Sequence, residues 1–285
     1  MTFAFHKARK PSRRARAKQK AVFVESEKLE QGMARTILDE VKALQGEAKL
    51  KDIARLISEA PPEQVLELMN EQGVLGIGTS LEPQLVQGAS AGAKTAAAEL
   101  GKVVVIDMRR PGFQSWLSTT MGNLVKDTTG TSMDALRTTL TDGIQRGRNP
   151  LKLAKDLKQS IGLTDPHAKA VIRRRADLIA QGVSEARADE LTERYREKLL
   201  KLRARTIART ESLQAVNGGR EQLWQQLVEE GAFEEGQEKE WLTAGDERTS
   251  EEHAAWEGMK VPVGEDFPQG APPTRPNCRC TVVLA

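Results

Sequence analysis

The sequence predicts a mainly α-helical protein with a small α+β domain at its C-terminal end. Two observations lead to this fold class. Over most of the chain, apolar residues recur at spacings of three and four, and capping residues and glycines divide these stretches into helices with short links. After Gly231, short runs of alternating apolar and polar residues take over. We therefore expect a helical bundle or hairpin stack followed by a short antiparallel sheet.

Four consecutive regions are expected: a basic arm (1–20), an N-terminal helical region (21–112), a central helical region (113–206) and a C-terminal α+β domain (207–285). In the second region, 88–100 predicts an alanine-rich helix that packs closely on a neighbour. The β-branched run 103–106 fits a strand and an extended connection equally well.

Capping signals divide the central region. Ser132 is a suitable N-cap, and Asn149 followed by Pro150 predicts another helix start. Ser184 opens a long helical segment, in which the run 217–219 (Asn-Gly-Gly) would permit a kink. Glycines expected to close helices are Gly147, Gly162 and Gly182.

In the last region we expect strands at 239–243, 260–263 and 280–284, and a short helix at 250–256. The strand near residue 240 should pair with the last strand. This arrangement would form a small sheet at the end of the chain.

The composition excludes some classes of protein. Apolar residues make up 39%, charged residues 29% and aromatic residues 4%, which is typical of a helix-rich protein with many solvated faces. No run of 18 apolar residues predicts a membrane span, and no apolar stretch follows the basic N-terminus to make a secretory signal. Residues 1–20 hold eight basic residues and no acid, whereas 229–252 hold ten acids. This polarity indicates more than one partner.

The basic arm is a candidate for non-specific contact with double-stranded DNA, because lysine and arginine neutralise phosphates without reading bases. A solvated tail, or an arm that docks on an acidic protein surface, fits the same composition. On a helix the run 173–175 (Arg-Arg-Arg) spans three faces, so at least one member should be partly buried or paired. The candidate DNA-binding residues of the arm are Lys7, Arg9, Lys10, Arg13, Arg14, Arg16, Lys18 and Lys20.

The two cysteines of the chain, Cys278 and Cys280, are two residues apart, so on a strand they would point to the same face. Together with His253 they offer three ligands for zinc, which prefers four, and Asp246 is the candidate fourth. The spacing is not the usual Cys-x2-Cys knuckle. The alternative is two buried apolar thiols and a surface or capping histidine. A disulfide between such near neighbours would be strained, and reduced thiols in a cytoplasm fit better.

A second candidate site is a structural lock between the helix around residue 210 and the loop around residue 247. Residues two apart on a helix do not face each other, so Arg209 and Glu211 must find partners elsewhere. We expect Arg209 to meet Asp246 and Arg248 to meet Glu211. The alternative is a solvated helix with scattered charges.

The sequence makes no positive case for catalysis. It contains no P-loop, no Gly-x-Gly-x-x-Gly and no His-Glu-x-x-His motif. A thiol hydrolase would need an oxyanion motif, and no glycine-rich motif precedes the cysteines. We therefore predict that the protein is not an enzyme.

The order of several motifs resembles the phage head morphogenesis family, the phage Mu F-like minor head proteins. The resemblance covers roughly residues 110–285. The segments that carry it are 207–211 (Ile-Ala-Arg-Thr-Glu), 241–249 (Trp-Leu-Thr-Ala-Gly-Asp-Glu-Arg-Thr), His253 and 277–280 (Asn-Cys-Arg-Cys).

The resemblance implies a low-copy minor capsid protein of a tailed bacteriophage virion. It would be made in the host bacterial cytoplasm and built into the procapsid inside the head, near the portal. Its partners would be the portal protein and the major capsid or scaffold protein, and it would aid head morphogenesis or DNA ejection. The alternative is a metal-dependent nuclease or a transferase-type toxin built on the C-terminal domain.

Overall fold

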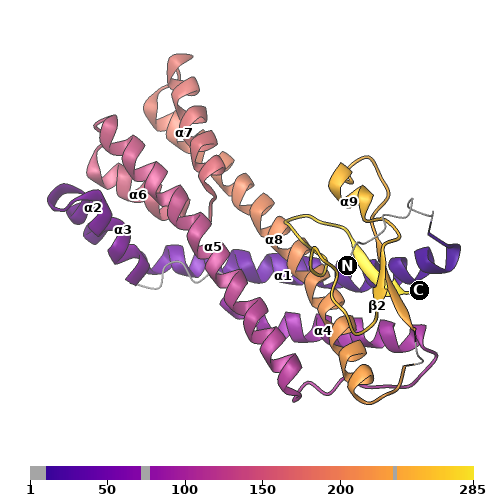
Figure 1. The fold of residues 1–285 in the computed structure, drawn as a ribbon. Coiled ribbons are helices and arrows are strands. Elements are labelled where there is room, and N and C mark those ends of the chain that lie inside the picture. Colours follow the sequence, from indigo (N-terminus) through magenta and orange to yellow (C-terminus); the bar gives the residue numbers. More distant parts are fainter. Residues whose placement is uncertain (1–10, 72–77, 234–235) are drawn as a thin grey trace. The chain divides into compact units, whose positions relative to one another are not determined.

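The computed structural model describes residues 11–71, 78–233 and 236–285. About 70% of the protein is helical, and a three-stranded antiparallel sheet lies near the C-terminus, which confirms the predicted fold class. Among the described residues no helix combines the length and the apolar character needed to cross a bilayer. In chain order the elements are α1 (Arg13–Glu47), α2 (Leu50–Glu59), α3 (Pro62–Glu71), the 3-10 turn η1 (Thr79–Leu81), α4 (Glu82–Glu99), α5 (Pro111–Gln145), α6 (Pro150–Ser160), α7 (Asp165–Ala180), α8 (Glu185–Glu229), β1 (Glu238–Leu242), α9 (Glu251–Ala255), β2 (Lys260–Pro262) and β3 (Thr281–Leu284) (Figure 1).

The chain forms two compact units, each built from segments that are distant in sequence. The first, here called the sheet unit, comprises 1–33, 82–118 and 206–285; the second, the helical unit, comprises 34–81 and 119–205. Because α1, α5 and α8 each contribute residues to both units, the partition differs from the four consecutive regions expected. The boundary expected after residue 20, for example, falls inside α1.

The helical unit has a core of aliphatic side chains from α2, α3, α5 and α6. Leu136, Leu140 and Leu157 are fully buried in it. Deep in the same unit, the Arg203 guanidinium of α8 donates to Ser132 Oγ, to Thr131 Oγ1 and to the carbonyl oxygens of 128, 162 and 163. This buried cation therefore joins α8 to α5 and to the α6–α7 link.

Most of the predicted helix ends are confirmed. The Asn149 side chain accepts hydrogen bonds from the first turn of α6, with Pro150 at the first helical position. Left-handed backbone follows α5, α6 and α7 at the three glycines expected there, Gly147, Gly162 and Gly182. The N-cap predicted at Ser132 is wrong, because α5 runs through it. Its hydroxyl instead donates to the Thr128 carbonyl oxygen and accepts from Arg203.

In the sheet unit the strand order is β2-β1-β3, and all pairs are antiparallel. The expected pairing of the strand near 240 with the last strand is confirmed, with Trp241 opposite Val282. Trp241 is fully buried and meets the rings of Trp256 and Phe267 edge-on at 5.3 and 5.4 Å. The segment 103–106 is a connection between α4 and α5 and not a strand.

Helix α4 is the alanine-rich helix that the sequence predicted to pack closely, and its partner is α8. A β-carbon at Gly92 would lie 1.9 Å from the Val216 carbonyl oxygen, and one at Gly219 would lie 1.9 Å from the Ala89 carbonyl oxygen. Glycine is therefore required on both helices where they cross. The run 217–219 does not interrupt the helix, since α8 is continuous from Glu185 to Glu229.

The outer edge of β3 is closed by side chains from three helices. The Leu284 amide donates to Glu99 at 2.9 Å, and its carbonyl oxygen accepts from Lys18 Nζ at 2.5 Å. Arg220 Nε donates to the Val282 carbonyl oxygen at 3.2 Å, and its guanidinium is paired with Glu99 at 2.5 Å. An edge strand would otherwise offer unpaired backbone groups to other chains. These bonds fix β3, and with it the segment that carries the cysteines, against α1, α4 and α8.

Candidate functional site

The histidine and the two cysteines singled out in the sequence come together in the sheet unit. His253 lies on α9, where the Ser250 hydroxyl accepts from its amide and caps the helix. Cys278 and Cys280 lie just before β3, and all three side chains are at most 4% exposed. His253 Nδ1 is 3.6 Å from Cys278 Sγ and 3.4 Å from Cys280 Sγ. Although the cysteines precede the strand, their sulfur atoms face the same side, as the spacing predicted.

The second ring nitrogen and the ring plane of His253 also have defined contacts. His253 Nε2 lies 3.0 Å from the Thr274 hydroxyl, and the ring stacks on Trp256 with centroids 4.8 Å apart. Between the sulfur atoms, a hydrogen bond from the Cys280 thiol lowers the pKa of Cys278 to about 5, while the same bond raises the pKa of Cys280.

Asp246 does not join this group, so the expectation that it supplies a fourth ligand is wrong. Both of its carboxylate oxygens accept from the Arg279 guanidinium, at 2.5 and 2.7 Å. These hydrogen bonds lower the pKa of Asp246 to about 2. Arg279 stands between the two cysteines in sequence, and its pairing with Asp246 engages both oxygens of that carboxylate.

The predicted charge lock is wrong in one half. Arg209 pairs with Glu30 of α1 at 3.0 Å, and not with Asp246, because α1 lies beside this part of α8. The pairing of Arg248 with Glu211 stays a prediction. Thr210, which lies between Arg209 and Glu211, does contact the cysteine segment, since its hydroxyl accepts from the Asn277 amide at 3.0 Å.

Sequence reasoning missed the main link between α8 and the cysteine segment. Asn217 donates to the Pro272 and Cys280 carbonyl oxygens, and its own side-chain oxygen accepts from the Thr281 hydroxyl at 2.6 Å. Arg220, one turn later, bonds β3. A signal for both was present, because Thr210, Asn217 and Arg220 are seven and three residues apart and form one polar stripe along a helix.

The predicted basic arm is partly corrected. Lys7, Arg9 and Lys10 lie outside the described residues, but from Arg13 onward the segment is the first part of α1 and not a separate arm. Arg16 donates to the Thr243 carbonyl oxygen at 2.7 Å and pairs with Glu257, so it is not available for DNA.

Lys18 is bonded to β3 and Glu99, and burial lowers its pKa. Ala15 packs on Leu242 and Val283, which explains why this segment is ordered. Exposed basic residues of the same turns are Arg13, Arg14 and Lys20.

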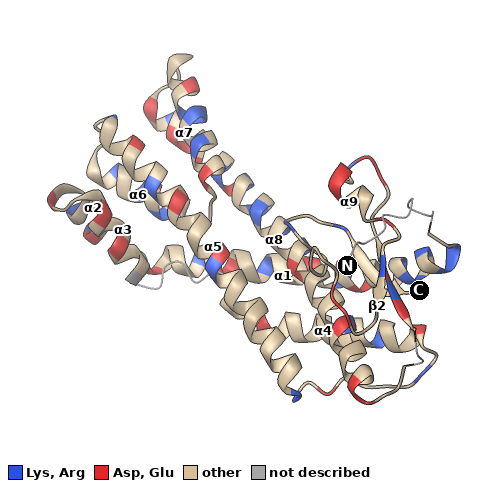
Figure 2. Ribbon diagram, in the orientation of Figure 1, with Lys and Arg blue, Asp and Glu red and all other residues tan. Residues whose placement is uncertain are grey.

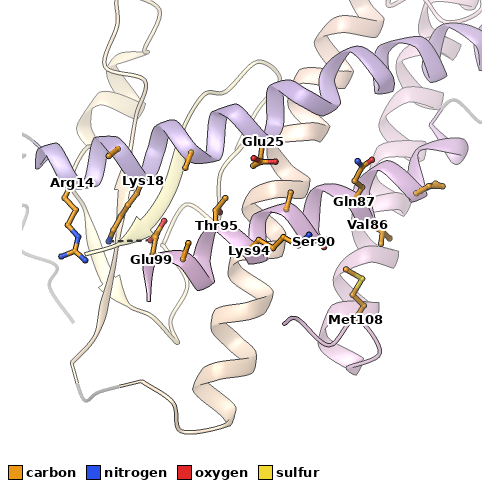
Figure 3. Close-up of a pocket in the computed structure, with 15 residues that line it drawn as sticks. Arg14, Lys18, Glu25, Val86, Gln87, Ser90, Lys94, Thr95, Glu99 and Met108 are labelled. Carbon is orange, nitrogen blue, oxygen red and sulfur yellow. Dashed lines mark ion pairs between the residues drawn. The ribbon is translucent and has the colours of Figure 1, made fainter. Parts of the chain in front are cut away.

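Two grooves lie on the surfaces of the units. In the sheet unit a groove of about 940 Å³ separates α1 from α4, with small side chains such as Ala17, Ala21 and Ala91 along it. Arg14, Lys18 and Glu99 lie at one end of this groove, as Figure 3 shows.

In the helical unit a groove of about 610 Å³ between α7 and α8 is lined by Arg173, Arg174, Arg194 and Lys198. Figure 2 shows the Lys and Arg positions of α7 and α8 in blue. Arg175 of the same run pairs with Asp189 at 2.7 Å, which confirms that one member of the triplet is paired.

The comparisons with known proteins place this geometry in a family. A family model described as "Phage Mu protein F like protein" matches residues 134–283, more than half of the chain. The match includes His253, both cysteines and Asn217 of α8, which bonds the Cys280 carbonyl oxygen. The search of curated proteins gives no match. The search of solved structures gives none either. The chain therefore belongs to the phage Mu F-like family of head morphogenesis proteins.

Proposed function

We propose that this chain is a minor head protein of a tailed phage that sits at the portal inside the head and aids head morphogenesis or DNA ejection. The observation that carries the proposal is the family match over residues 134–283. Portal association and ejection are inferences beyond that match. They are supported by surfaces suited to protein and to DNA.

Contact with DNA is supported by exposed basic residues in both units. Arg13, Arg14 and Lys20 are exposed on the first turns of α1, which follow the basic residues at positions 7, 9 and 10. The α7–α8 groove adds four cations to a lining with one acid, Asp177, and one of the four, Arg194, is also paired with Glu190 at 2.7 Å. No base-reading element is required, because phosphate contacts alone give sequence-independent and salt-dependent binding.

Contact with protein is supported by a different set of residues. Val103 and Val105 expose nearly all of their side chains from the extended segment before α5. Exposed apolar side chains of this size favour a protein contact when they lie together. Glu247, Glu251 and Glu252 are exposed around the start of α9, where their charge would repel DNA.

A non-catalytic role is part of the proposal. The His253–Cys278–Cys280 cluster borders a cavity of only about 40 Å³, which has room for a water molecule but not for a nucleotide. The thiols and the imidazole are buried and engaged with one another. This environment suits a structural group better than a nuclease or transferase centre.

Particle assembly tests this function. The cognate portal, scaffold and major capsid proteins would be co-expressed with the chain, and purified procapsids would be quantified by mass spectrometry. We expect a few copies of the chain per portal ring, and none in particles assembled without portal protein. Absence from complete particles, or incorporation in proportion to the capsid protein whether or not portal is present, would refute the proposal.

The DNA contact is tested separately by the salt dependence of binding to a double-stranded fragment of arbitrary sequence. Each phosphate contact contributes about 0.9 to the slope of log affinity against log salt concentration. Replacing Arg173, Arg174, Arg194 and Lys198 by glutamine should lower that slope by about 2 to 4. Arg146, an exposed residue directly after α5 that pairs with Asp142, is a control position whose glutamine variant should change the slope by no more than about 1.

A further inference from the structure

We propose that His253, Cys278 and Cys280 bind one zinc ion, which fastens α9 to the segment that leads into β3. This inference concerns a site of the sheet unit and is independent of the portal-bound role. Its ligand atoms would be His253 Nδ1 and the two cysteine Sγ atoms. These are the only histidine, cysteine or acidic side chains in the described part of the chain that gather as a possible metal-binding group, with ligand atoms all within 4.8 Å of one another.

The distances are those of a tetrahedral zinc site. With Zn–S bonds of about 2.3 Å and Zn–N bonds of about 2.05 Å, tetrahedral angles place sulfur and nitrogen ligands about 3.6 Å apart. The observed Nδ1–Sγ distances are 3.6 and 3.4 Å. Both nitrogen–sulfur distances therefore already match those of a shared zinc ion.

The residues around the ligands support the same assignment. A zinc-bound histidine usually donates its second ring N–H to an acceptor, which fixes the tautomer and the orientation of the ring. Here His253 Nε2 lies 3.0 Å from the Thr274 hydroxyl, so an N–H at Nε2 would leave the lone pair of Nδ1 facing the sulfur atoms. Stacking on Trp256 and the Ser250 cap hold the ring and its helix in place.

The charge balance also favours a divalent ion. Two thiolates neutralise Zn²⁺, so the bound site would carry no net charge in a buried position, and binding would release the thiol protons. Two sulfur ligands and one imidazole are soft or borderline donors, which suit zinc better than magnesium or calcium. The Arg279–Asp246 pair balances its own charge beside the site.

The fourth coordination position would be taken by a water molecule. Asp246 is committed to Arg279, and the cavity of about 40 Å³ beside the three ligands is large enough for one water. Catalytic zinc sites also have three protein ligands and one exchangeable water, so the two kinds of site share the number of ligands. The small size of the cavity leaves the ion a structural role.

The test is the metal content of the full chain, purified under reducing conditions in zinc-supplemented medium without a histidine tag. Elemental analysis by mass spectrometry should give one zinc per chain. Replacement by Co²⁺ should give the intense absorption of cobalt–thiolate bonds. Cys278→Ser and His253→Ala should lose the metal, whereas His167→Gln, which changes a histidine of the helical unit, should keep one zinc.

Two further measurements keep the test decisive if a ligand variant fails to fold. Thr274→Val leaves the ligands in place but removes the partner of Nε2, so zinc affinity should fall about 10- to 100-fold. In the unmodified chain, a chelator should lower the melting temperature and expose both thiols to a thiol reagent. A chain with free thiols that takes up neither zinc nor cobalt, or one that isolates with a Cys278–Cys280 disulfide, would overturn the proposal.

Discussion

Adding a single methyl group at Gly92 should destabilise the sheet unit severely. A β-carbon there would lie 1.9 Å from the Val216 carbonyl oxygen and 2.8 Å from its carbonyl carbon. Carbon and oxygen approach to about 3.3 Å without repulsion, so α4 and α8 would have to separate by about 1.4 Å. Backbone cannot rotate away as a side chain can. Overpacking of this kind costs about 3 kcal/mol.

The matched control is Gly122, a helical glycine of α5 with no atom within 4 Å of its added β-carbon. Alanine there should stabilise the protein by about 0.5–1 kcal/mol, because glycine loses more backbone entropy on folding. The two variants should therefore differ by about 4 kcal/mol, or roughly 10 °C in melting temperature.

The assay is urea and thermal unfolding followed by circular dichroism, with Gly219→Ala as the reciprocal change on α8. A β-carbon at Gly219 would lie 1.9 Å from the Ala89 carbonyl oxygen, so this variant should lose stability to a similar extent. Equal melting temperatures for Gly92→Ala and Gly122→Ala would show that α4 and α8 do not cross closely at Gly92.

Further predictions concern buried charges. Burial and the nearby Arg203 charge lower the pKa of His167, so the folded protein resists its protonation. The contribution of His167 to the free energy of unfolding should be fully present above the ordinary pKa of 6.5 and should be lost as pH falls below it. His167→Gln should flatten this dependence of the urea midpoint on pH. Arg203→Met should cost about 1–3 kcal/mol in urea unfolding, because it removes the donor to the carbonyl oxygens of 162 and 163; no measurable loss would contradict those contacts. Arg220→Ala should cost about 3–5 kcal/mol, because the buried Glu99 carboxylate keeps only the more distant Lys18, at 3.8 Å, as a charged partner. Adding Glu99→Gln should recover part of the loss, and a double variant as unstable as the single one would argue against this pair.

Local chemistry made much of the fold predictable from sequence. Capping at Asn149 and left-handed glycines after three helices depend only on neighbouring residues, and both appear in the structure. The pairing of β1 with β3 follows from two alternating runs in a domain with few strands. The prediction for Ser132 was wrong because a distant residue decides its role. Its hydroxyl accepts a hydrogen bond from Arg203, 71 residues away, and this contact stabilises a serine in the middle of a helix.

The candidate site was predictable in its residue types but not in its partners. Spacing placed Cys278 and Cys280 on one side, and the grouping of His253 with them is confirmed. Charge alone could not choose between Arg209 and Arg279 as the partner of Asp246, because both are arginines and only the fold decides which one is near. For the same reason Arg16 and Lys18 looked like free arm residues until the packing of α1 on the sheet was known.

The central claim is tested most directly by co-sedimentation of the purified chain with its cognate portal ring at moderate salt. The full chain would be compared with a variant lacking residues 1–10, which spares the anchoring residues Arg16 and Lys18, and with Val103→Lys/Val105→Lys. We predict that the full chain and the shortened chain sediment with the ring, and that the double lysine variant binds more weakly. If the folded full chain stays in the supernatant at every portal concentration, the protein is not a portal-bound head component.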